Sequence, residues 1–380
     1  MAKFIYICNS DGALYKFRYP LIKALVDAGH EVHTITSSSS PEGSFVEQIE
    51  ELGVSTHTAD FDSRNSGIIH VAKLIFTLSK IINKVNPDYI HCFTHKANLL
   101  GGIASFISFN KYKLFFSITG AGLIYTQDDL KYRLVRYIFN FLYKLLSRKV
   151  DVVFFQNPDD ELLFIENKVF DKHVCQVTNG SGFDPFSIDF SSSCSLSSTF
   201  DIENTTKIKV LYPSRALFEK GVHEFYSAAK IICTLSNKFE FFHVGSPSDS
   251  DQDGYTLEML KSSDCVNYIK HRKSIYDLIK SADIVTLPSY REGTPRSVIE
   301  ALYFDKFVIT TDAPGCRETV FDNWNGVLIQ PRSINSLVSA LLSHENTNFE
   351  QYKGRSKSIF DAKYHSKHIV KQTFNNYFGE

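Results

Sequence analysis

Short apolar runs alternate with segments of helical periodicity along most of this chain. Residues 3–8 are typical of a buried strand, residues 19–28 of a helix, and residues 31–36 of a second strand. The pattern recurs with a helix at about 68–84 and a strand at 89–93. Strand, helix and strand in this order predict a parallel, doubly wound α/β sheet.

A second series of such units begins with a strand at 209–212. Between the two series, residues 191–201 are polar and serine-rich and lack periodicity, which is typical of a linker. A chain of 380 residues is also long for one core. The predicted division is therefore an N-terminal domain at 1–190, a linker at 191–206, a C-terminal domain at 207–360, and a last helix within 361–380 that packs back toward the first domain.

The most informative stretch reads IVTLPSYREGTPRSVIEAL, from Ile284 to Leu302. A buried strand ends before Pro288, and a short loop follows. Thr294 is the expected N-cap of the next helix, with Pro295 at its first position. The start of a helix attracts anions because its N–H groups are unpaired and its dipole is positive there.

Two acids lie in this stretch, Glu292 in the loop and Glu300 in the helix. Glu300 could form an ordinary i,i+4 surface pair with Arg296, and Glu292 could simply be solvated. The apolar neighbours of Glu300 favour a functional carboxylate instead. Gly293 would let a ligand approach the backbone closely.

The segment YREGTPRSVIEAL resembles the E-x7-E signature of retaining glycosyltransferases of family 4, which have the GT-B fold. Three further pieces match in order: PSRALFEKGV at 213–222, TTDAPGCRETV at 310–320 and NGVLIQPRS at 325–333. The resemblance is strongest to bacterial enzymes that extend surface glycans on a polyprenyl diphosphate carrier. It implies an α/β protein with two doubly wound Rossmann-like domains facing each other across a cleft.

A nucleoside-diphosphate sugar brings a leaving group whose negative charge grows as the glycosidic bond breaks. Arg215 offers a planar fork for phosphate oxygens, and Lys220 a flexible point charge. The resemblance implies that Glu300 binds the ribose hydroxyls and that Glu292 binds the donor sugar beside the anomeric carbon. The other expected donor contacts are Gly293, Thr294, Asp312 and Gly315.

The resemblance implies that the N-terminal domain holds the acceptor. The candidate residues Gly12, His95, Lys96 and Thr119 follow predicted strands, and the segment that begins Thr-His-Lys at 94–96 is similar to one in that subgroup of bacterial enzymes. Gly12 alone remains of the glycine-rich loop that relatives usually carry. His95 could equally be a capping or core residue. Relatives often have a histidine after the strand at 114–118, and this chain has none there, so a mechanism assisted by that histidine is not carried over.

Residues 131–149 hold six basic residues, no acid and many apolar residues. This profile is typical of a helix that lies in an anionic membrane interface. A core helix of the first domain with basic ends has the same profile. Both alternatives stay open.

Composition narrows the classes of function. The chain is 43% hydrophobic and 22% charged, with a net charge of −1, which argues against a nucleic-acid partner. Seven scattered cysteines, none in C-x-x-C spacing, favour a reducing compartment over disulfides or zinc. The acidic run at 249–253 begins like a calcium loop but lacks its final glutamate, so no metal or other cofactor is expected. Without an apolar run long enough for a signal peptide or a bilayer span, the expected location is cytoplasmic, with peripheral attachment at the inner membrane as a further option.

The leading hypothesis is a retaining, metal-independent transferase. It would move a hexose or N-acetylhexosamine from a nucleotide sugar, expected to be UDP-linked, to a lipid-linked oligosaccharide of an O-antigen, capsule or exopolysaccharide. The alternatives are a nucleotide-sugar 2-epimerase of similar fold and a non-catalytic assembly scaffold. The donor base and sugar and the acceptor stay open, because loops rather than the fold set them. The oligomeric state and the choice between a nucleophile and a front-face mechanism also stay open.

Overall fold

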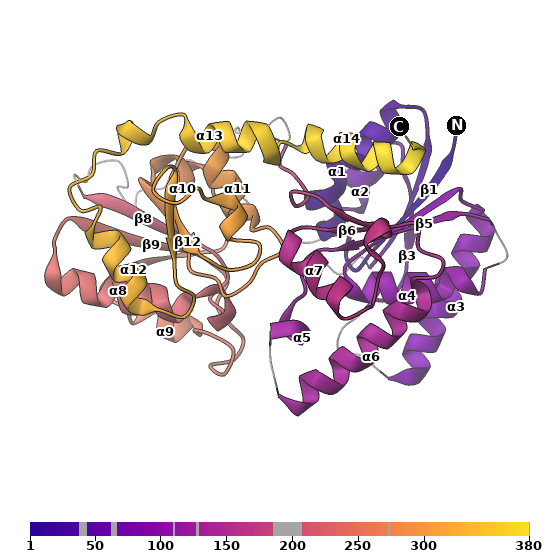
Figure 1. Cartoon of the computed structure of the whole chain (residues 1–380), viewed down its shortest axis with the longest axis horizontal. Coiled ribbons are helices and arrows are strands. Elements are labelled where there is room, and N and C mark those ends of the chain that lie inside the picture. The colour runs from indigo at the N-terminus through magenta and orange to yellow at the C-terminus, as the bar shows by residue number, and fades with distance from the viewer. Residues whose placement is uncertain are drawn as a thin grey trace. The chain divides into compact units, whose positions relative to one another are not determined.

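The computed structural model describes residues 1–37, 44–61, 67–108, 111–126, 129–184, 207–272 and 274–379. The chain forms two compact units (Figure 1). Unit 1 comprises Met1–Gly182 and Ser366–Glu380, and unit 2 comprises Phe183–His365. The predicted linker at 191–206 lies outside the described residues.

Unit 1 contains a parallel sheet with seven strands among its described residues, in the order β3-β2-β1-β4-β5-β6-β7. The strands are β1 (Lys3–Cys8), β2 (Glu31–Thr36), β3 (Ser55–Thr58), β4 (Tyr89–Phe93), β5 (Lys113–Ile118), β6 (Val152–Phe155) and β7 (Cys175–Val177). The helices are α1 (Asp11–Asp27), α2 (Val46–Glu50), α3 (Ile68–Val85), α4 (His95–Phe106), α5 (Leu123–Thr126), α6 (Leu130–Leu146), α7 (Pro158–Glu166) and α14 (Ser366–Phe378).

The sheet of unit 1 is buried on both faces. Along β1, Tyr6 packs into the core beneath α1 and α14, and Ile5 and Ile7 pack into the core beneath α3, α4 and α6. Figure 1 shows α1 and α14 above this sheet and α3, α4 and α6 below it. The helix α4 packs closely because it carries glycine: a Cβ at Gly102 would lie 2.8 Å from the Leu146 side chain of α6.

The helix α1 begins earlier than predicted. The sequence predicted a helix only from residue 19 and placed Gly12 in a loop, yet α1 starts at Asp11 and contains Pro20. Ser10 is its N-cap, and the Ser10 hydroxyl accepts a hydrogen bond from the Ala13 N–H at 3.2 Å. Gly12 therefore lies in the first helical turn and not in a loop.

The chain returns to unit 1 at its C-terminal end. Phe360 and Tyr364 are buried in the core of unit 2, so the change of unit comes at Ser366 and not at residue 361. From there α14 packs on α1, and the Tyr377 hydroxyl lies 2.9 Å from that of Tyr6. The last helix thus completes the core of the N-terminal unit.

Unit 2 has a parallel sheet with six strands among its described residues, in the order β10-β9-β8-β11-β12-β13. The strands are β8 (Ile208–Pro213), β9 (Phe239–Gly245), β10 (Val266–Lys270), β11 (Ile284–Leu287), β12 (Phe307–Thr311) and β13 (Gly326–Ile329). The helices are α8 (Val222–Leu235), α9 (Leu257–Lys261), α10 (Tyr276–Ser281), α11 (Arg296–Tyr303), α12 (Ile334–Leu342) and α13 (Arg355–Ile359), with a π-helical turn at Phe360–Tyr364. None of the described helices in either unit is long and apolar enough to cross a membrane.

Because β8, β11 and β12 are neighbours and parallel, the loops after them meet at one edge of the sheet. The predicted donor residues lie in these loops. In parallel α/β sheets this carboxyl edge is where ligands bind.

Candidate active site

The loop between β11 and α11 carries the first acid of the E-x7-E segment. The helix begins at Arg296, and Pro295 is its N-cap in an extended conformation, without a side-chain cap bond. The expected N-cap at Thr294 is therefore wrong by one residue. Thr294 is half-buried and Gly293 is buried, so both lie at the junction of loop and helix.

Lys220 and Glu292 form an ion pair at this edge. The Lys220 ammonium lies 2.7 Å from Glu292 Oε1 and 2.8 Å from Oε2, and the two side chains are only 18% and 13% exposed. Burial disfavours the charged ammonium, but attraction and hydrogen bonding to Glu292 prevail and raise the pKa of Lys220. The lysine therefore stays protonated.

Two glycines bring these residues together. Gly221 has φ +80°, and a Cβ there would lie 2.2 Å from the carbonyl oxygen of Pro288. Gly315 has φ +81°, and its Cβ would lie 2.2 Å from the carbonyl oxygen of Glu292. The loops after β8 and β12 thus pack directly on the loop after β11, and the predicted Gly315 lies beside Glu292.

Arg215 follows β8 and is exposed. Within the described residues its guanidinium has no hydrogen-bond or ion-pair partner. The positive charge of Arg215 lowers the pKa of Lys220 slightly. The attraction of Glu292, which raises that pKa, is the larger effect. The structure therefore brings Arg215, Lys220 and Glu292 together at one edge of the sheet.

Two residues around Glu292 were missed by the sequence analysis. The buried hydroxyl of Ser289 donates to Glu292 Oε1 at 2.9 Å. The thiol of Cys316 is buried nearby, and burial together with the negative charge of Glu292 raises its pKa to about 12. In the sequence, only the position of Ser289 directly after the strand and Pro288 suggested that it lies at the site. That position does not predict its hydrogen bond to Glu292.

Glu300 forms an i,i+4 ion pair with Arg296, which the sequence analysis had left open as one alternative. The Arg296 Nε donates to Glu300 Oε1 at 2.8 Å, and Glu300 is only 8% exposed. The same guanidinium lies 4.4 Å above the ring of Phe183. Burial and the charge of Glu300 raise the pKa of Tyr276 to about 12. The pair is thus partly buried, unlike an ordinary surface pair.

Asp312 lies at the carboxyl end of β12, as predicted. Its side chain is 62% exposed and accepts a 2.7 Å hydrogen bond from Arg317 Nε. The ligand contacts of Asp312, Gly293, Thr294 and Glu300 stay predictions.

The four acceptor-side candidates gather at one edge of unit 1. Gly12 follows β1, His95 and Lys96 follow β4, and Thr119 follows β5, and these three strands are neighbours. Lys96 donates from Nζ to the carbonyl oxygen of Phe61 at 3.1 Å.

His95 makes structural contacts through both ring nitrogens. Its Nε2 lies 3.1 Å from the carbonyl oxygen of Gly120, and its Nδ1 lies 2.9 Å from the Tyr143 hydroxyl. A carbonyl only accepts, so Nε2 carries the proton and Nδ1 accepts from the tyrosine. Burial lowers the pKa of His95, which favours this neutral form. These contacts favour the alternative of a core residue.

The loop after β5 has a second anchor. The buried carboxylate of Asp160 accepts from the Ala121 N–H and from Asn157 Nδ2, both at 3.0 Å. Asn157 caps α7 by accepting from the Asp160 N–H at 2.8 Å. The loop that carries Thr119 is thus fixed by Asp160 on one side and His95 on the other.

Comparison with known families decides the class of protein. The family model described as "Glycosyl transferase 4-like" matches residues 5–157, and "Glycosyl transferases group 1" matches residues 199–357. The two models fit the two units in order. The chain belongs to the GT-B glycosyltransferases of the family 4 type.

Curated relatives of this family 4 glycosyltransferase match over most of its length. The N,N'-diacetylbacillosaminyl-diphospho-undecaprenol alpha-1,3-N-acetylgalactosaminyltransferase of Campylobacter jejuni is 28% identical over 97% of this chain and 96% of its own. The UDP-Gal:alpha-D-GlcNAc-diphosphoundecaprenol alpha-1,3-galactosyltransferase of Escherichia coli is 22% identical over 73% of this chain and 72% of its own.

Solved structures share the GT-B fold. The Anabaena protein HepE in complex with UDP-glucose has a TM-score of 0.76 at 18% identity, and the match covers 99% of both chains. The sucrose-phosphate synthase of Thermosynechococcus elongatus has a TM-score of 0.77 at 16% identity, covering 99% of this chain and 98% of that one. The family 4 glycosyltransferase thus has two Rossmann-like domains, as the sequence predicted.

Proposed function

We propose that this glycosyltransferase moves a hexose or N-acetylhexosamine from a UDP-sugar to a lipid-diphosphate-linked acceptor, with retention at the anomeric carbon. The product would belong to a surface polysaccharide. The observation that carries the proposal is the group formed by exposed Arg215 and the Lys220–Glu292 pair at the carboxyl edge of unit 2. Two cations and one acid there suit a diphosphate next to a sugar.

The cations have different tasks in this proposal. The Arg215 guanidinium is exposed and presents several N–H groups in a plane that fits two phosphate oxygens. The Lys220 ammonium has three protons and directs two toward Glu292, which leaves one for a phosphate oxygen. As the bond to the sugar breaks, both cations stabilise the charge that develops on the leaving UDP.

Glu292 is suited to hold the sugar and poorly suited to attack it. Both of its oxygens accept hydrogen bonds from Lys220, and one also accepts from Ser289. These bonds reduce the nucleophilicity of the carboxylate. We therefore favour a front-face displacement: the bond from the anomeric carbon to the phosphate oxygen breaks, the bond to the acceptor oxygen forms on the same face, and the acceptor proton passes to the leaving phosphate.

The relatives support the donor and acceptor classes. The names of two of them give undecaprenol-diphosphate-linked sugars as acceptors and α-1,3 linkages as products, and one names UDP-galactose as donor. A solved structure of the same fold holds UDP-glucose. For this chain we propose a UDP-sugar donor and the same acceptor class, used at the cytoplasmic face of the membrane.

Incubation with a panel of nucleotide sugars, followed by thermal unfolding and mass analysis of the products, tests the proposal. We expect UDP or one UDP-sugar to raise the unfolding temperature and a sugar to pass to a diphosphate-linked lipid acceptor. Epimerised donor formed without acceptor would support the 2-epimerase alternative, and stabilisation by none of the nucleotides would support the scaffold.

Arg215→Ala separates chemistry from folding. Because the side chain is exposed and unpaired within the described residues, its loss should leave the unfolding temperature unchanged and lower turnover about 100-fold. Lys230→Ala, an exposed lysine on α8, is the matched control and should keep full activity. Normal turnover of Arg215→Ala would contradict the assignment.

A further inference from the structure

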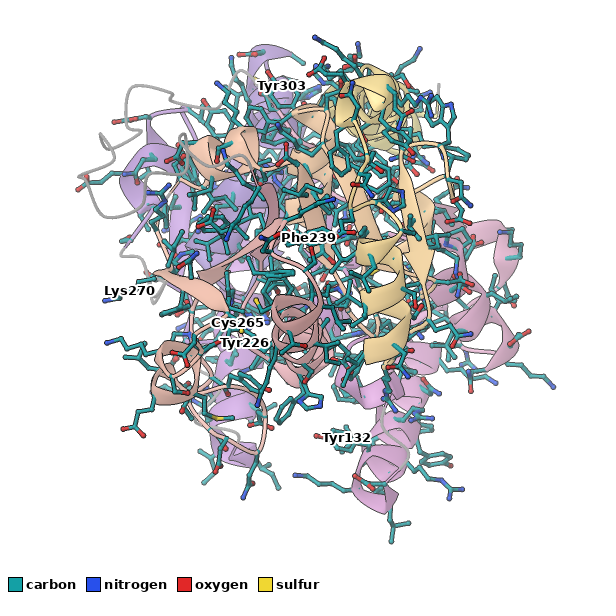
Figure 2. All side chains as sticks on the ribbon, turned by 90° about the vertical axis from the view of Figure 1, so that its left-hand side faces the viewer. Tyr132, Tyr226, Phe239, Cys265, Lys270 and Tyr303 are labelled. Carbon is teal, nitrogen blue, oxygen red and sulfur yellow. The ribbon has the colours of Figure 1, made fainter. Side chains whose placement is uncertain are left out.

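The helix α6 exposes an apolar stripe that its own unit does not cover. Of its residues only Tyr143 and Leu146 are buried. Six large apolar side chains are between 46% and 82% exposed: Leu130, Leu134, Tyr137, Ile138, Phe141 and Leu145. At about 100° per residue they occupy one stripe of about 100°, on the side away from the core. Tyr132, labelled in Figure 2, marks the first turn of this helix.

Cations border the stripe on both sides. At the same helical angle per residue, Lys131 lies along one margin, and Arg133 and Lys144 lie along the other. All three are exposed, as are Arg148 and Lys149 just beyond the helix. The sequence contains no acid from Leu130 to Val150.

The helix α3 has the same character. Ile68, Ile69 and Phe76 are 88%, 86% and 60% exposed, and the Lys80 ammonium lies 5.5 Å from the centre of the Phe76 ring. The residues from Ile68 to the end of α3 contain no acid.

The helices α3 and α6 belong to one layer of unit 1. Figure 1 shows both on the side of the sheet where α4 lies, and α4 packs against each of them. Each helix follows the carboxyl end of a strand and runs back along the sheet, so their first turns lie at the same edge. That edge also carries His95 and Thr119.

The segment that contains these helices differs in charge from the whole chain. Residues 67–150 hold 12 Lys and Arg against 3 Asp and Glu, a formal charge of +9, in a chain whose net charge is −1. The remaining residues therefore carry −10. Such a segregated cationic field attracts an anionic surface.

We infer that α6 and α3 form a membrane-docking face, which binds an anionic lipid surface. The apolar side chains enter the interface, and the bordering cations meet lipid phosphates. A second copy of the chain fits less well, because it would bring the exposed cations Lys131, Arg133 and Lys144 of both copies together. The inference concerns binding and is independent of the transfer reaction proposed above.

Co-sedimentation of the full chain with lipid vesicles tests this face in the absence of substrate. We expect binding to vesicles of phosphatidylcholine with about 30% phosphatidylglycerol at about 50 mM salt, and much weaker binding at about 500 mM salt. Vesicles of phosphatidylcholine alone should bind little. Absence of binding to the anionic vesicles at low salt would overturn the inference and leave the proposed reaction untouched.

Variants locate the contact. Lys144→Glu with Arg148→Glu, and separately Leu134→Ser with Phe141→Ser, should each weaken vesicle binding about tenfold or more. The matched control is Lys230→Glu with Lys261→Glu, which reverses two exposed lysines of unit 2 and should bind normally. Equal binding by all three variants would refute the assignment to α6.

Fluorescence reports insertion directly. The chain contains one tryptophan, Trp324, so Phe141→Trp in a Trp324→Phe background places a single reporter on α6. We expect a blue shift and quenching by brominated lipid on addition of anionic vesicles. An unshifted spectrum would contradict insertion. If light scattering shows dimers that Leu134→Ser with Phe141→Ser dissociates, the face is instead a contact between copies.

Discussion

The Lys220 ammonium lies 2.7 and 2.8 Å from the two carboxylate oxygens of Glu292, a residue 72 positions away in the sequence. The two residues belong to loops after the neighbouring strands β8 and β11. Since both side chains are mostly buried, each charge depends on the other. The pair therefore contributes to stability as well as to the proposed chemistry, and variants must separate the two.

A double-mutant cycle separates the contribution of the pair to stability from its contribution to turnover. Lys220→Met should lower the free energy of unfolding by about 2 kcal/mol or more, because it leaves the Glu292 carboxylate buried without its cation. Adding Glu292→Gln should restore most of that loss, since a neutral amide tolerates an apolar neighbour. Turnover should stay about 100-fold low in both proteins. If restored stability also restored turnover, the pair would be structural only.

The two glutamates should differ in what they bind. Glu300→Gln should weaken the affinity for free UDP, because contacts with the ribose are similar in the ground state and the transition state. Glu292→Gln should chiefly lower turnover, because its proposed contacts are with the donor sugar beside the reacting carbon, and free UDP lacks that sugar. Calorimetry with UDP and steady-state kinetics measure the two effects. Equal loss of UDP affinity in both variants would argue against separate roles.

Gly315 should tolerate no side chain. Gly315→Ala incurs the strain of a positive φ and also a Cβ 2.2 Å from the carbonyl oxygen of Glu292. Gly354→Ala is the matched control: its φ is also +81°, but its Cβ would enter open space. We expect Gly315→Ala to lower the free energy of unfolding by at least about 2 kcal/mol more than the control. Similar losses would show that the loops do not press together.

Acid should destabilise unit 2 through His243. Its ring is buried between the Tyr226 hydroxyl at 3.0 Å and the carbonyl oxygen of Ser214 at 2.9 Å, and burial lowers its pKa from 6.5 to about 4. Tyr226 is labelled in Figure 2. Below pH 6.5 the unfolded chain binds this proton and the folded chain does not, so stability falls as the pH decreases toward 4.

From pH 7 to pH 5 this effect should cost about 2 kcal/mol. Guanidinium titrations at both pH values measure it. His243→Gln should reduce the pH dependence by that amount, whereas His173→Gln, which alters an exposed histidine, should leave it unchanged. An unchanged slope in His243→Gln would show that the ring is already protonated or hydrated in the folded protein.

The sequence by itself determined the elements and the family. Apolar runs and helical periodicity are local properties, so they predicted β1, β2, β4 and β11 closely. The E-x7-E segment and its companion motifs indicated the GT-B fold. The predicted ends of two helices were wrong. The helix α1 is capped by Ser10 and begins well before Pro20, and the N-cap of α11 is Pro295 rather than Thr294.

Tertiary structure alone decided which side chains meet and which surfaces stay exposed. The bonds from Lys220 and Ser289 to Glu292 depend on the order of strands in the sheet, which periodicity does not encode. The sequence of residues 131–149 fitted both a core helix and an interfacial helix. Only the packing of α4 against one side of α6 shows that Leu134 and Phe141 face outward, because burial depends on neighbours that are distant in the sequence.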